Sequence, residues 1–212
     1  MNIKKLKHCC MVIHTGEATI VTDPGVFSVE EHDKIQHADI ILITHEHADH
    51  FHIESVKAMH KRIPGASIIA NDTVAELLAK EGIEHHVMRH GDAVDVKGVH
   101  IEAFGEKHAL MHRSIPQSSN VGFFIEKRFF YPGDAFTTPG GSVDVLALPV
   151  AGPWMKVAEA IDYALEVKPR IAFPVHDGMA GGSFAHVLCG KVLGQNGIEF
   201  MSIEDGGSIN VK

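Results

Sequence analysis

The sequence is poor in cysteine, with only Cys9, Cys10 and Cys189 among 212 residues. An odd count without a regular spacing argues against a secreted scaffold held together by disulfides. Cys9 and Cys10 are adjacent, so their side chains point to opposite faces if this segment is a strand. We interpret the three cysteines as small buried apolar residues in a reducing compartment.

The sequence also lacks a long apolar run. Three lysines near the N-terminus precede the apolar run 9–13, which His14 ends and which is too short for the core of a signal peptide. No run approaches the length of a membrane span. These absences predict a cytoplasmic protein that does not associate with a membrane.

An excess of positive charge is missing as well. Lysine and arginine number 19 against 27 aspartates and glutamates, so the formal net charge is −8 with neutral histidines. Nucleic-acid-binding proteins usually present a basic field. No nucleic-acid partner is therefore expected, and a small-molecule substrate is favoured. The pattern leaves open whether the chain forms a homo-oligomer.

The chain also has no linker rich in proline or serine, no charged tail and no repeat of fixed period. Its hydrophobic fraction of 45% is ample for a buried core, and its charged fraction of 22% does not suggest disorder. We expect one domain over residues 1–212.

Histidine is abundant, with 17 copies. It is the commonest metal ligand, but a high count alone is weak support for a metal site. The positions of the histidines relative to the predicted strands decide the matter.

Short apolar runs alternate with single amphipathic segments along the chain. Strands are expected at 10–14, 19–22, 39–44, 67–70, 85–89, 93–96, 99–104, 120–126, 128–131, 143–150, 170–175, 199–203 and 208–211, and helices at 28–37, 53–63, 72–80, 154–167 and 183–193. Asp72 is the expected N-cap of its helix, and the last two strands look like a closing hairpin. This order predicts two mixed sheets with helices packed outside.

Residues that can bind a metal follow five of these strands. They are Asp23, His45, His108, Asp134 and His176. Open sheets place ligand sites beyond the carboxyl ends of their strands, so five such ends could converge on one site.

The densest cluster is His45, His47, Asp49 and His50. Residues two apart in the loop after a strand point in similar directions, so His45 and His47 can bind one ion and Asp49 and His50 a second. Imidazole and carboxylate suit zinc, iron, manganese or nickel. No cysteine lies near this cluster in the sequence, so a structural zinc-cysteine site is not expected. A histidine-rich surface loop is the alternative, which four ligand-type residues in six positions disfavour.

Residues 44–50, Thr-His-Glu-His-Ala-Asp-His, resemble the HxHxDH signature of the metallo-β-lactamase superfamily. Its other motifs occur in order over nearly the whole chain, at Asp23, the Gly91-Asp92 turn, His108, Asp134 and His176. The resemblance implies an α/β fold, a four-layer αβ/βα sandwich of two mixed β-sheets with helices on the outer faces.

The resemblance also implies two divalent metal ions, with zinc first and manganese, iron or nickel as alternatives. The implied ligands are His45, His47 and His108 for one ion, Asp49, His50 and His176 for the other, and Asp134 as the bridge. Asp23 would orient these ligands from behind.

The substrate-binding residues are harder to predict. His112 is an alternative to His108 as ligand, although His108 is preferred because it follows the strand 99–104. We expect His112 and Arg113 to contact the substrate, since an arginine could pair with a carboxylate or phosphate. The glycine-rich segment 179–183 could also shape the pocket, and Trp154 could line it or pack at the start of a helix.

The implied reaction is hydrolysis, in which a metal-bridging hydroxide attacks the carbon or phosphorus of an ester, lactone or phosphoester. Asp49 would orient the hydroxide or return a proton, so Asp49 and Asp23 are the predicted catalytic residues. The motifs around His108 and Asp134 resemble the branch related to bacterial ascorbate-phosphate lactonases. A lactone or ester is therefore expected first and a phosphodiester second.

Three alternatives remain. A phosphodiesterase or nuclease is a hydrolase of the same kind, which the acidic composition disfavours. A di-iron redox protein on this fold would resemble HxExDH, whereas Glu46 is displaced by one position and His47 takes the ligand place. A non-catalytic metal-binding protein is disfavoured because the whole ligand set is present.

Overall fold

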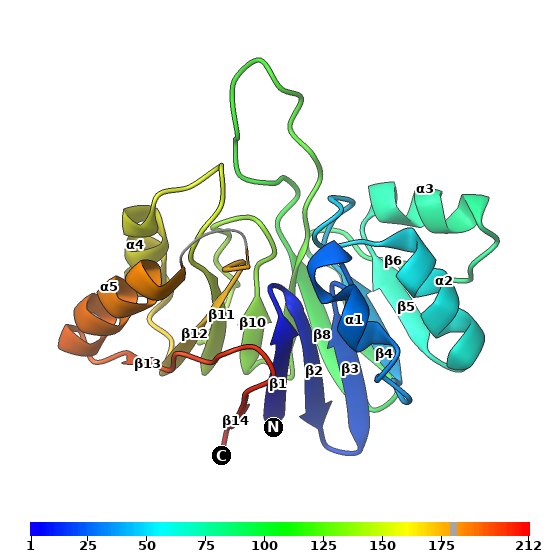
Figure 1. The fold of residues 1–212 in the computed structure, drawn as a ribbon, viewed down its shortest axis with the longest axis horizontal. Helices are drawn as coiled ribbons and strands as arrows, with labels where there is room; N and C mark the ends of the chain where they lie inside the picture. The colour runs from blue at the N-terminus through cyan, green and yellow to red at the C-terminus, as the bar shows by residue number, and fades with distance from the viewer. Residues whose placement is uncertain (179–181) are drawn as a thin grey trace.

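The computed structural model describes residues 1–178 and 182–212, and there it forms two seven-stranded sheets (Figure 1). The first sheet has the order β14-β1-β2-β3-β4-β5-β6. Its strands are β1 (Asn2–Lys7), β2 (Cys10–Thr15), β3 (Ala18–Thr22), β4 (Ile40–Ile43), β5 (Ser67–Ala70), β6 (His86–Val87) and β14 (Ser208–Asn210). The strands from β14 to β3 pair antiparallel, and those from β3 to β6 pair parallel.

The second sheet has the order β13-β12-β11-β10-β9-β8-β7. Its strands are β7 (Ala93–Val96), β8 (Val99–Phe104), β9 (Gly122–Ile125), β10 (Phe129–Tyr131), β11 (Val145–Pro149), β12 (Ile171–Val175) and β13 (Glu199–Phe200). Here β7 to β10 pair antiparallel, and β10 to β13 pair parallel. Both sheets are therefore mixed, as predicted.

Helices cover the outer face of each sheet (Figure 1). They are η1 (Val26–Ser28), α1 (Val29–His32), α2 (Ile53–Arg62) and α3 (Asp72–Lys80) on the first sheet, and α4 (Val157–Val167) and α5 (Gly182–Gln195) on the second. No helix in the described ranges is long and apolar enough to cross a lipid bilayer.

Three apolar clusters hold these four layers together. The central one fills the space between the sheets and includes Ile13, Phe123 and Phe173. A second lies between the first sheet and its helices, and a third between the other sheet and α4 and α5. In β8, buried and half-buried residues alternate because one face of the strand meets the central cluster. The predicted αβ/βα sandwich is confirmed.

Several local predictions are wrong. Residues 199–203 and 208–211 do not form a hairpin, because β13 pairs with β12 and β14 pairs with β1 in the other sheet. The strand β1 was not predicted. The helix expected at 28–37 is only α1 with a preceding 3-10 turn. Asn71, not Asp72, caps α3 by accepting from the Val74 N–H.

The loop between β8 and β9 projects beyond the ends of the strands (Figure 1). It exposes Leu110, Met111 and Ile115 to solvent.

Candidate metal centre

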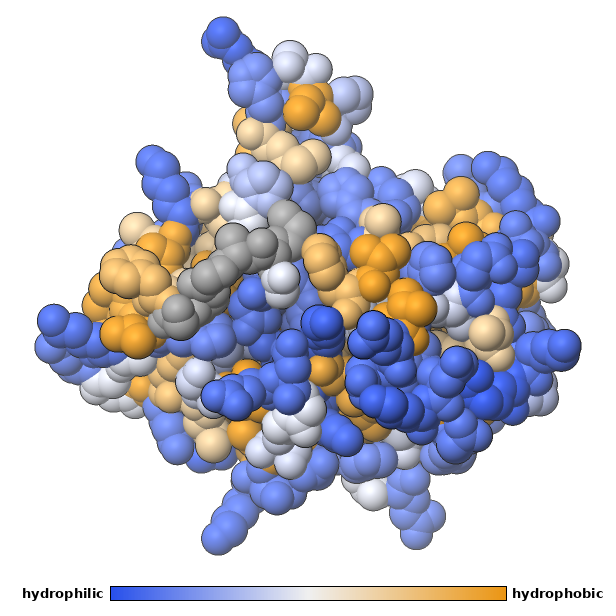
Figure 2. Space-filling view, viewed as in Figure 1, coloured by the Kyte–Doolittle hydropathy of each residue, from blue (hydrophilic) through white to orange (hydrophobic). Residues whose placement is uncertain are grey.

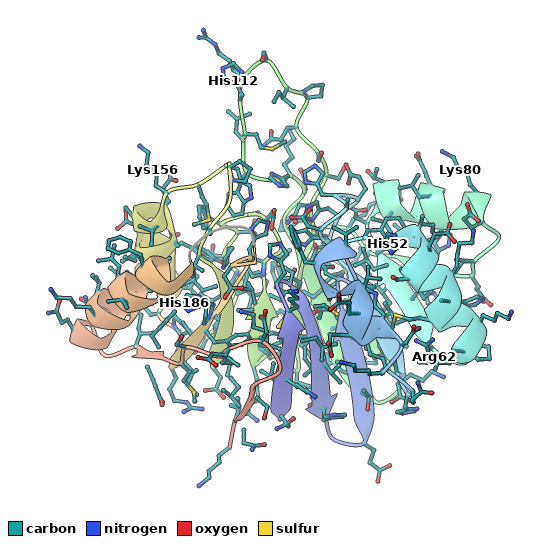
Figure 3. All side chains as sticks on the ribbon, in the orientation of Figure 1. His52, Arg62, Lys80, His112, Lys156 and His186 are labelled. Carbon is teal, nitrogen blue, oxygen red and sulfur yellow. The ribbon has the colours of Figure 1, made fainter. Side chains whose placement is uncertain are left out.

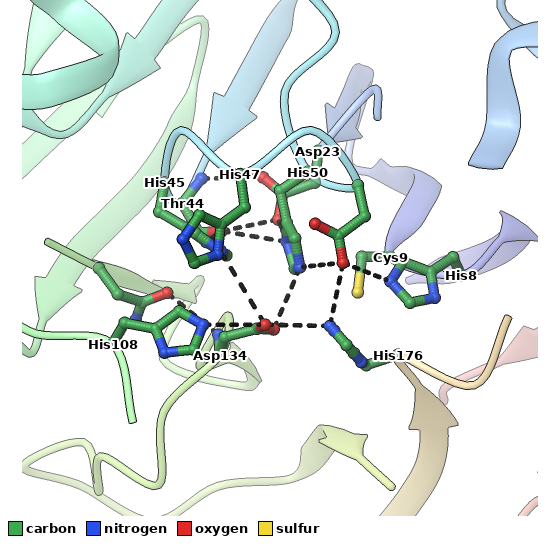
Figure 4. Close-up of polar contacts among 12 residues, drawn as sticks. His8, Cys9, Asp23, Thr44, His45, His47, His50, His108, Asp134 and His176 are labelled. Carbon is green, nitrogen blue, oxygen red and sulfur yellow. Dashed lines mark hydrogen bonds and ion pairs between the residues drawn. The ribbon is translucent and has the colours of Figure 1, made fainter. Parts of the chain in front are cut away.

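The structure brings the five predicted strand ends together at one edge of the sandwich. Asp23 follows β3, the loop 45–50 follows β4, Asp134 follows β10 and His176 follows β12, while His108 lies in the loop after β8. Figure 4 shows their side chains around a common centre. Parallel strands in each sheet place these carboxyl ends on the same side.

A first group of donor atoms comes from His45, His47, His108 and Asp134, which lie within 4.8 Å of one another. His45 Nε2 is 3.1 Å from His47 Nδ1, and His108 Nε2 is 3.2 Å from Asp134 Oδ2. His47 Nε2 lies 3.2 Å from the Ser118 hydroxyl, which leaves its Nδ1 free to face the group.

A second group consists of Asp49, His50, His176 and His8, again within 4.8 Å. Asp49 Oδ2 lies 3.3 Å from both His8 Nε2 and His176 Nε2, and 3.8 Å from His50 Nε2. This carboxylate is 20% exposed, whereas the three imidazoles are almost completely buried.

Asp134 lies between the two groups. Its Oδ1 is 3.1 Å from His50 Nε2, and its Oδ2 is 3.0 Å from His176 Nε2 and 3.2 Å from His108 Nε2. The Trp154 indole N–H donates to the same Oδ2 over 3.0 Å. One carboxylate therefore contacts histidines of both groups.

Asp23 lies behind His50 and is completely buried. Its carboxylate is 2.6 Å from His50 Nδ1 and accepts from the Thr44 N–H and hydroxyl over 2.8 and 2.7 Å. The Tyr131 hydroxyl donates to it as well. Asp23 therefore reaches the centre only through its neighbours, as an orienting residue would.

Two glycines allow the ligand loops to pack closely. A Cβ on Gly25 would lie 1.8 Å from the Asp49 carbonyl oxygen. A Cβ on Gly133 would lie 2.3 Å from Asn120 Oδ1, and Gly133 also has a φ of 65°. Because Asn120 Oδ1 accepts from the Asp134 N–H, a side chain at 133 would disturb the position of Asp134.

Several residues at the candidate metal centre have a strained backbone conformation. Non-glycine residues with positive φ include His8 (57°), Asp23 (36°) and His176 (56°). Such conformations cost of order 1–3 kcal/mol each and persist where the surrounding structure holds them, often at functional sites.

Burial and mutual contact shift the pKa values at the centre. Burial, aided by His50, holds the pKa of His45 well below 6.5. Burial also opposes the charged form of His176, but Asp134 and Asp49 raise its pKa to about 10. For Asp134, burial favours the neutral acid, yet His50, His108 and His176 hold its pKa well below the usual value. The centre thus places the buried Asp134 carboxylate beside the buried, protonated imidazole of His176.

The donor set fits divalent cations. The Nε2 atoms of His50, His108 and His176 and the Oδ1 atom of Asp134 are buried and make no hydrogen bond within residues 1–178 and 182–212, although they approach one another as ion pairs. Buried polar groups without hydrogen bonds are costly, and native proteins rarely keep several in one place. Imidazole and carboxylate donors suit zinc and the other metals predicted.

A cavity of about 300 Å³ opens onto the centre. The candidate ligands Asp49, His108, Asp134 and His176 are among its lining residues. Its apolar walls are Val26, Phe27, Met111, Pro153 and Trp154.

The structure places the predicted substrate residues differently. His112 and Arg113 are exposed and do not line this cavity, and His112 lies at the far end of the projecting loop (Figure 3). His108, not His112, is at the centre. Residues 179–181 of the glycine-rich segment lie outside the described residues. Figure 2 shows apolar surface on the projecting loop.

The sequence did not predict that His8 and Cys9 lie at the centre. His8 follows β1 directly, so the strand-end rule that found the other residues would have found it had β1 been predicted. Cys9 is buried and lies within 4.8 Å of His50 and Asp134 donor atoms. Burial raises the pKa of its thiol, but His8 and His50 outweigh this and lower it to about 6.

A family model described as the beta-lactamase superfamily domain matches residues 2–176. The chain therefore belongs to the metallo-β-lactamase superfamily. Together with the clusters of His and Asp donors, this membership makes the protein a metal-dependent hydrolase.

Similar proteins and solved structures match this chain over most of its length. Protein Rv0786c of Mycobacterium tuberculosis is 30% identical over 99% of both chains. A UPF0173 metal-dependent hydrolase of Pyrococcus abyssi is 28% identical over 83% of this chain and 84% of its own. The structure of Igni18, a metallo hydrolase from Ignicoccus hospitalis, shares the fold with a TM-score of 0.79 at 19% identity, covering 100% of each chain.

Proposed function

We propose that the chain hydrolyses an uncharged carboxylic ester or lactone with the help of two divalent cations. The observation that carries this proposal is the pair of donor groups that Asp134 joins. His45, His47 and His108 with Asp134 would hold one cation, and Asp49, His50 and His176 with Asp134 the other. Zinc is the first candidate, with manganese, iron and nickel as alternatives.

Bound cations of this kind supply a nucleophilic water near neutral pH and polarise the substrate oxygen. The protein's own part is to position the reacting groups and handle protons. Asp49 is the more exposed of the two central carboxylates and lines the cavity, so its oxygens can accept a proton and return it to the leaving group. Trp154 holds Asp134 through its N–H.

The cavity walls favour an apolar substrate. Val26, Phe27, Met111 and Pro153 offer alkyl and aromatic surface. None of the described lining residues is lysine or arginine, and residues 179–183 contain neither in the sequence. A phosphate or carboxylate on the non-reacting part of the substrate would therefore be desolvated without a cationic side chain as partner.

The test joins metal analysis with a substrate panel. Purified protein should carry two divalent ions per chain and cleave uncharged aryl esters or lactones faster than phosphate monoesters and diesters. Loss of a residue that only hydrogen-bonds to a metal ligand lowers activity by about 10–100-fold. His45→Ala removes a ligand itself and should lower kcat/KM by more than that. The control His86→Ala changes an exposed histidine in β6 and should match wild type. Metal-loaded protein inert to the whole panel would refute the proposal.

A further inference from the structure

His8 is a buried histidine next to the second donor group. It lies in the turn between β1 and β2, is 1% exposed and has a φ of 57°. Its ring centroid is 4.2 Å from that of His176, and its Nε2 is 3.3 Å from Asp49 Oδ2. By distance alone, His8 could be a fourth ligand of a second cation.

The hydrogen bonds of the other histidines show which nitrogen they offer. Nδ1 of His108 and of His176 lies 2.6 Å from a backbone carbonyl, and Nδ1 of His50 lies 2.6 Å from the Asp23 carboxylate. Carbonyl and carboxylate oxygens only accept, so each Nδ1 carries the proton. In the neutral ring, each Nε2 then has a free lone pair directed at the centre, as metal ligands require.

His8 has the opposite arrangement. The Gly178 backbone N–H donates to His8 Nδ1 over 3.1 Å. An amide N–H can only donate, so this nitrogen keeps its lone pair and the proton of the neutral ring lies on Nε2. A protonated Nε2 cannot bind a cation, but it can donate to Asp49 Oδ2, the atom that it faces.

We infer that His8 is not a metal ligand but a positioning residue, which holds the Asp49 carboxylate through an Nε2–H donor. The inference rests on the proposed second cation. It leaves Asp49, His50, His176 and Asp134 as the ligands of that cation. His8 also joins two ligand loops, because Gly178 lies two residues after His176 and Asp49 lies in the loop after β4.

The contact between Gly178 and His8 shows that the arrangement is tight. A Cβ at 178 would lie 3.0 Å from His8 Nδ1, closer than most real Cβ contacts. Glycine therefore lets the backbone approach the ring and hold it in one tautomer.

The direct test reads the tautomer of His8 by ¹⁵N NMR of histidine-labelled, zinc-loaded protein. His8→Gln identifies the His8 signals by their loss. His8 should show a protonated Nε2 and an unprotonated Nδ1, while His50, His108 and His176 show the reverse. A His8 that is protonated at Nδ1 and metal-shifted at Nε2 would overturn the inference.

Metal titration of variants gives a second readout that does not depend on activity. His8→Gln keeps an N–H donor near the Nε2 position and should bind two cations with affinities within about threefold of wild type. His8→Leu has no donor and should weaken the second cation by about 10–100-fold. His176→Ala is the reference for a lost ligand, and circular dichroism confirms that each variant is folded.

The outcomes separate the two claims. If His8→Gln loses the second cation as completely as His176→Ala, His8 is a ligand and the inference fails. If wild type binds one cation or none, the proposed two-cation site fails instead, and the tautomer of His8 still reports whether it donates to Asp49.

Discussion

At the scale of single residues, the centre depends on which atom of each side chain carries a proton. Asp23 accepts from Thr44, His50 and Tyr131, and these contacts fix the proton of His50 on Nδ1. The sequence predicted Asp23 in this role only through the family resemblance. The four groups that donate to it belong to three residues, Thr44, His50 and Tyr131, each at least 21 positions away in the sequence, so no local pattern records them.

Replacing Asp23 with asparagine tests this role. The new side-chain amide would present N–H groups to donors, so His50 would lose its acceptor and the preferred tautomer. Asp23→Asn should reduce metal affinity and kcat/KM by about 10–100-fold while the fold remains. Asp33→Asn is the matched control, because the Asp33 side chain is 90% exposed and contacts Arg62 rather than any residue of the centre. Equal behaviour of the two variants would contradict the role.

The pKa of His176 leads to a prediction about protons. Burial lowers the pKa, but Asp134 and Asp49 raise it to about 10, so the metal-free protein holds this proton at pH 7. Cation binding should release it, and affinity should fall as the pH falls. Calorimetry at pH 7 in buffers of different ionisation enthalpy should show net proton release. Binding without proton release would contradict the shift.

The same shift affects the stability of the metal-free protein. The folded pKa lies above the unfolded value of 6.5, so the contribution of His176 to stability is complete below about pH 6.5. It is lost as the pH rises through about 10. The Tm of chelator-treated protein should therefore fall as the pH rises between these values. The fall should be smaller in His176→Gln, which lacks the titrating imidazole.

At the scale of elements, the strand-end rule predicted most of the centre. The runs before Asp23, His45 and His176 are wholly buried, as strands covered on both faces are, and their ends were clear in the sequence. β1 was missed because three of its six residues are lysines, although Lys5 is buried against Asp177. The final hairpin was wrong because pairing across the molecule, not the intervening turn, decides where β13 and β14 lie.

The loop after β4 also depends on Gly25. Gly25→Ala would place a methyl group against the Asp49 carbonyl, so the loop must move. We expect a loss of about 1–3 kcal/mol in unfolding free energy, as overpacking causes, together with weaker metal binding. Gly65→Ala is the control, since a Cβ there meets nothing within 4 Å. Similar denaturation midpoints for the two variants would contradict the close packing at Gly25.

At the scale of the whole molecule, the candidate ligands join the two sheets. His45, His47, Asp49 and His50 follow the first sheet, whereas His108, Asp134 and His176 follow strands of the second. The motif order predicted the sandwich and this convergence. Trp154 does line the cavity, which is one of the two alternatives drawn from the sequence, but the sequence could not predict the walls formed by Val26 and Met111, because these residues come together only through loop packing.

Metal removal should therefore loosen the whole sandwich. Cations that bind only the folded protein stabilise it by about 4 kcal/mol at a free concentration 1,000 times Kd. For a chain of this length, that corresponds to a fall in Tm of about 10 °C after chelation. Calorimetry with and without added metal measures it, and His86→Ala should respond like wild type. An unchanged Tm would show that the cations do not join the sheets.

The central claim is a two-cation centre joined by Asp134. Anomalous diffraction from crystals of the metal-loaded protein, collected above and below the absorption edge of the metal, tests it most directly. The account predicts two peaks about 3.5–4 Å apart on either side of the Asp134 carboxylate. One peak is predicted beside His45, His47 and His108, and the other beside Asp49, His50 and His176. A single peak, or peaks away from Asp134, would contradict it.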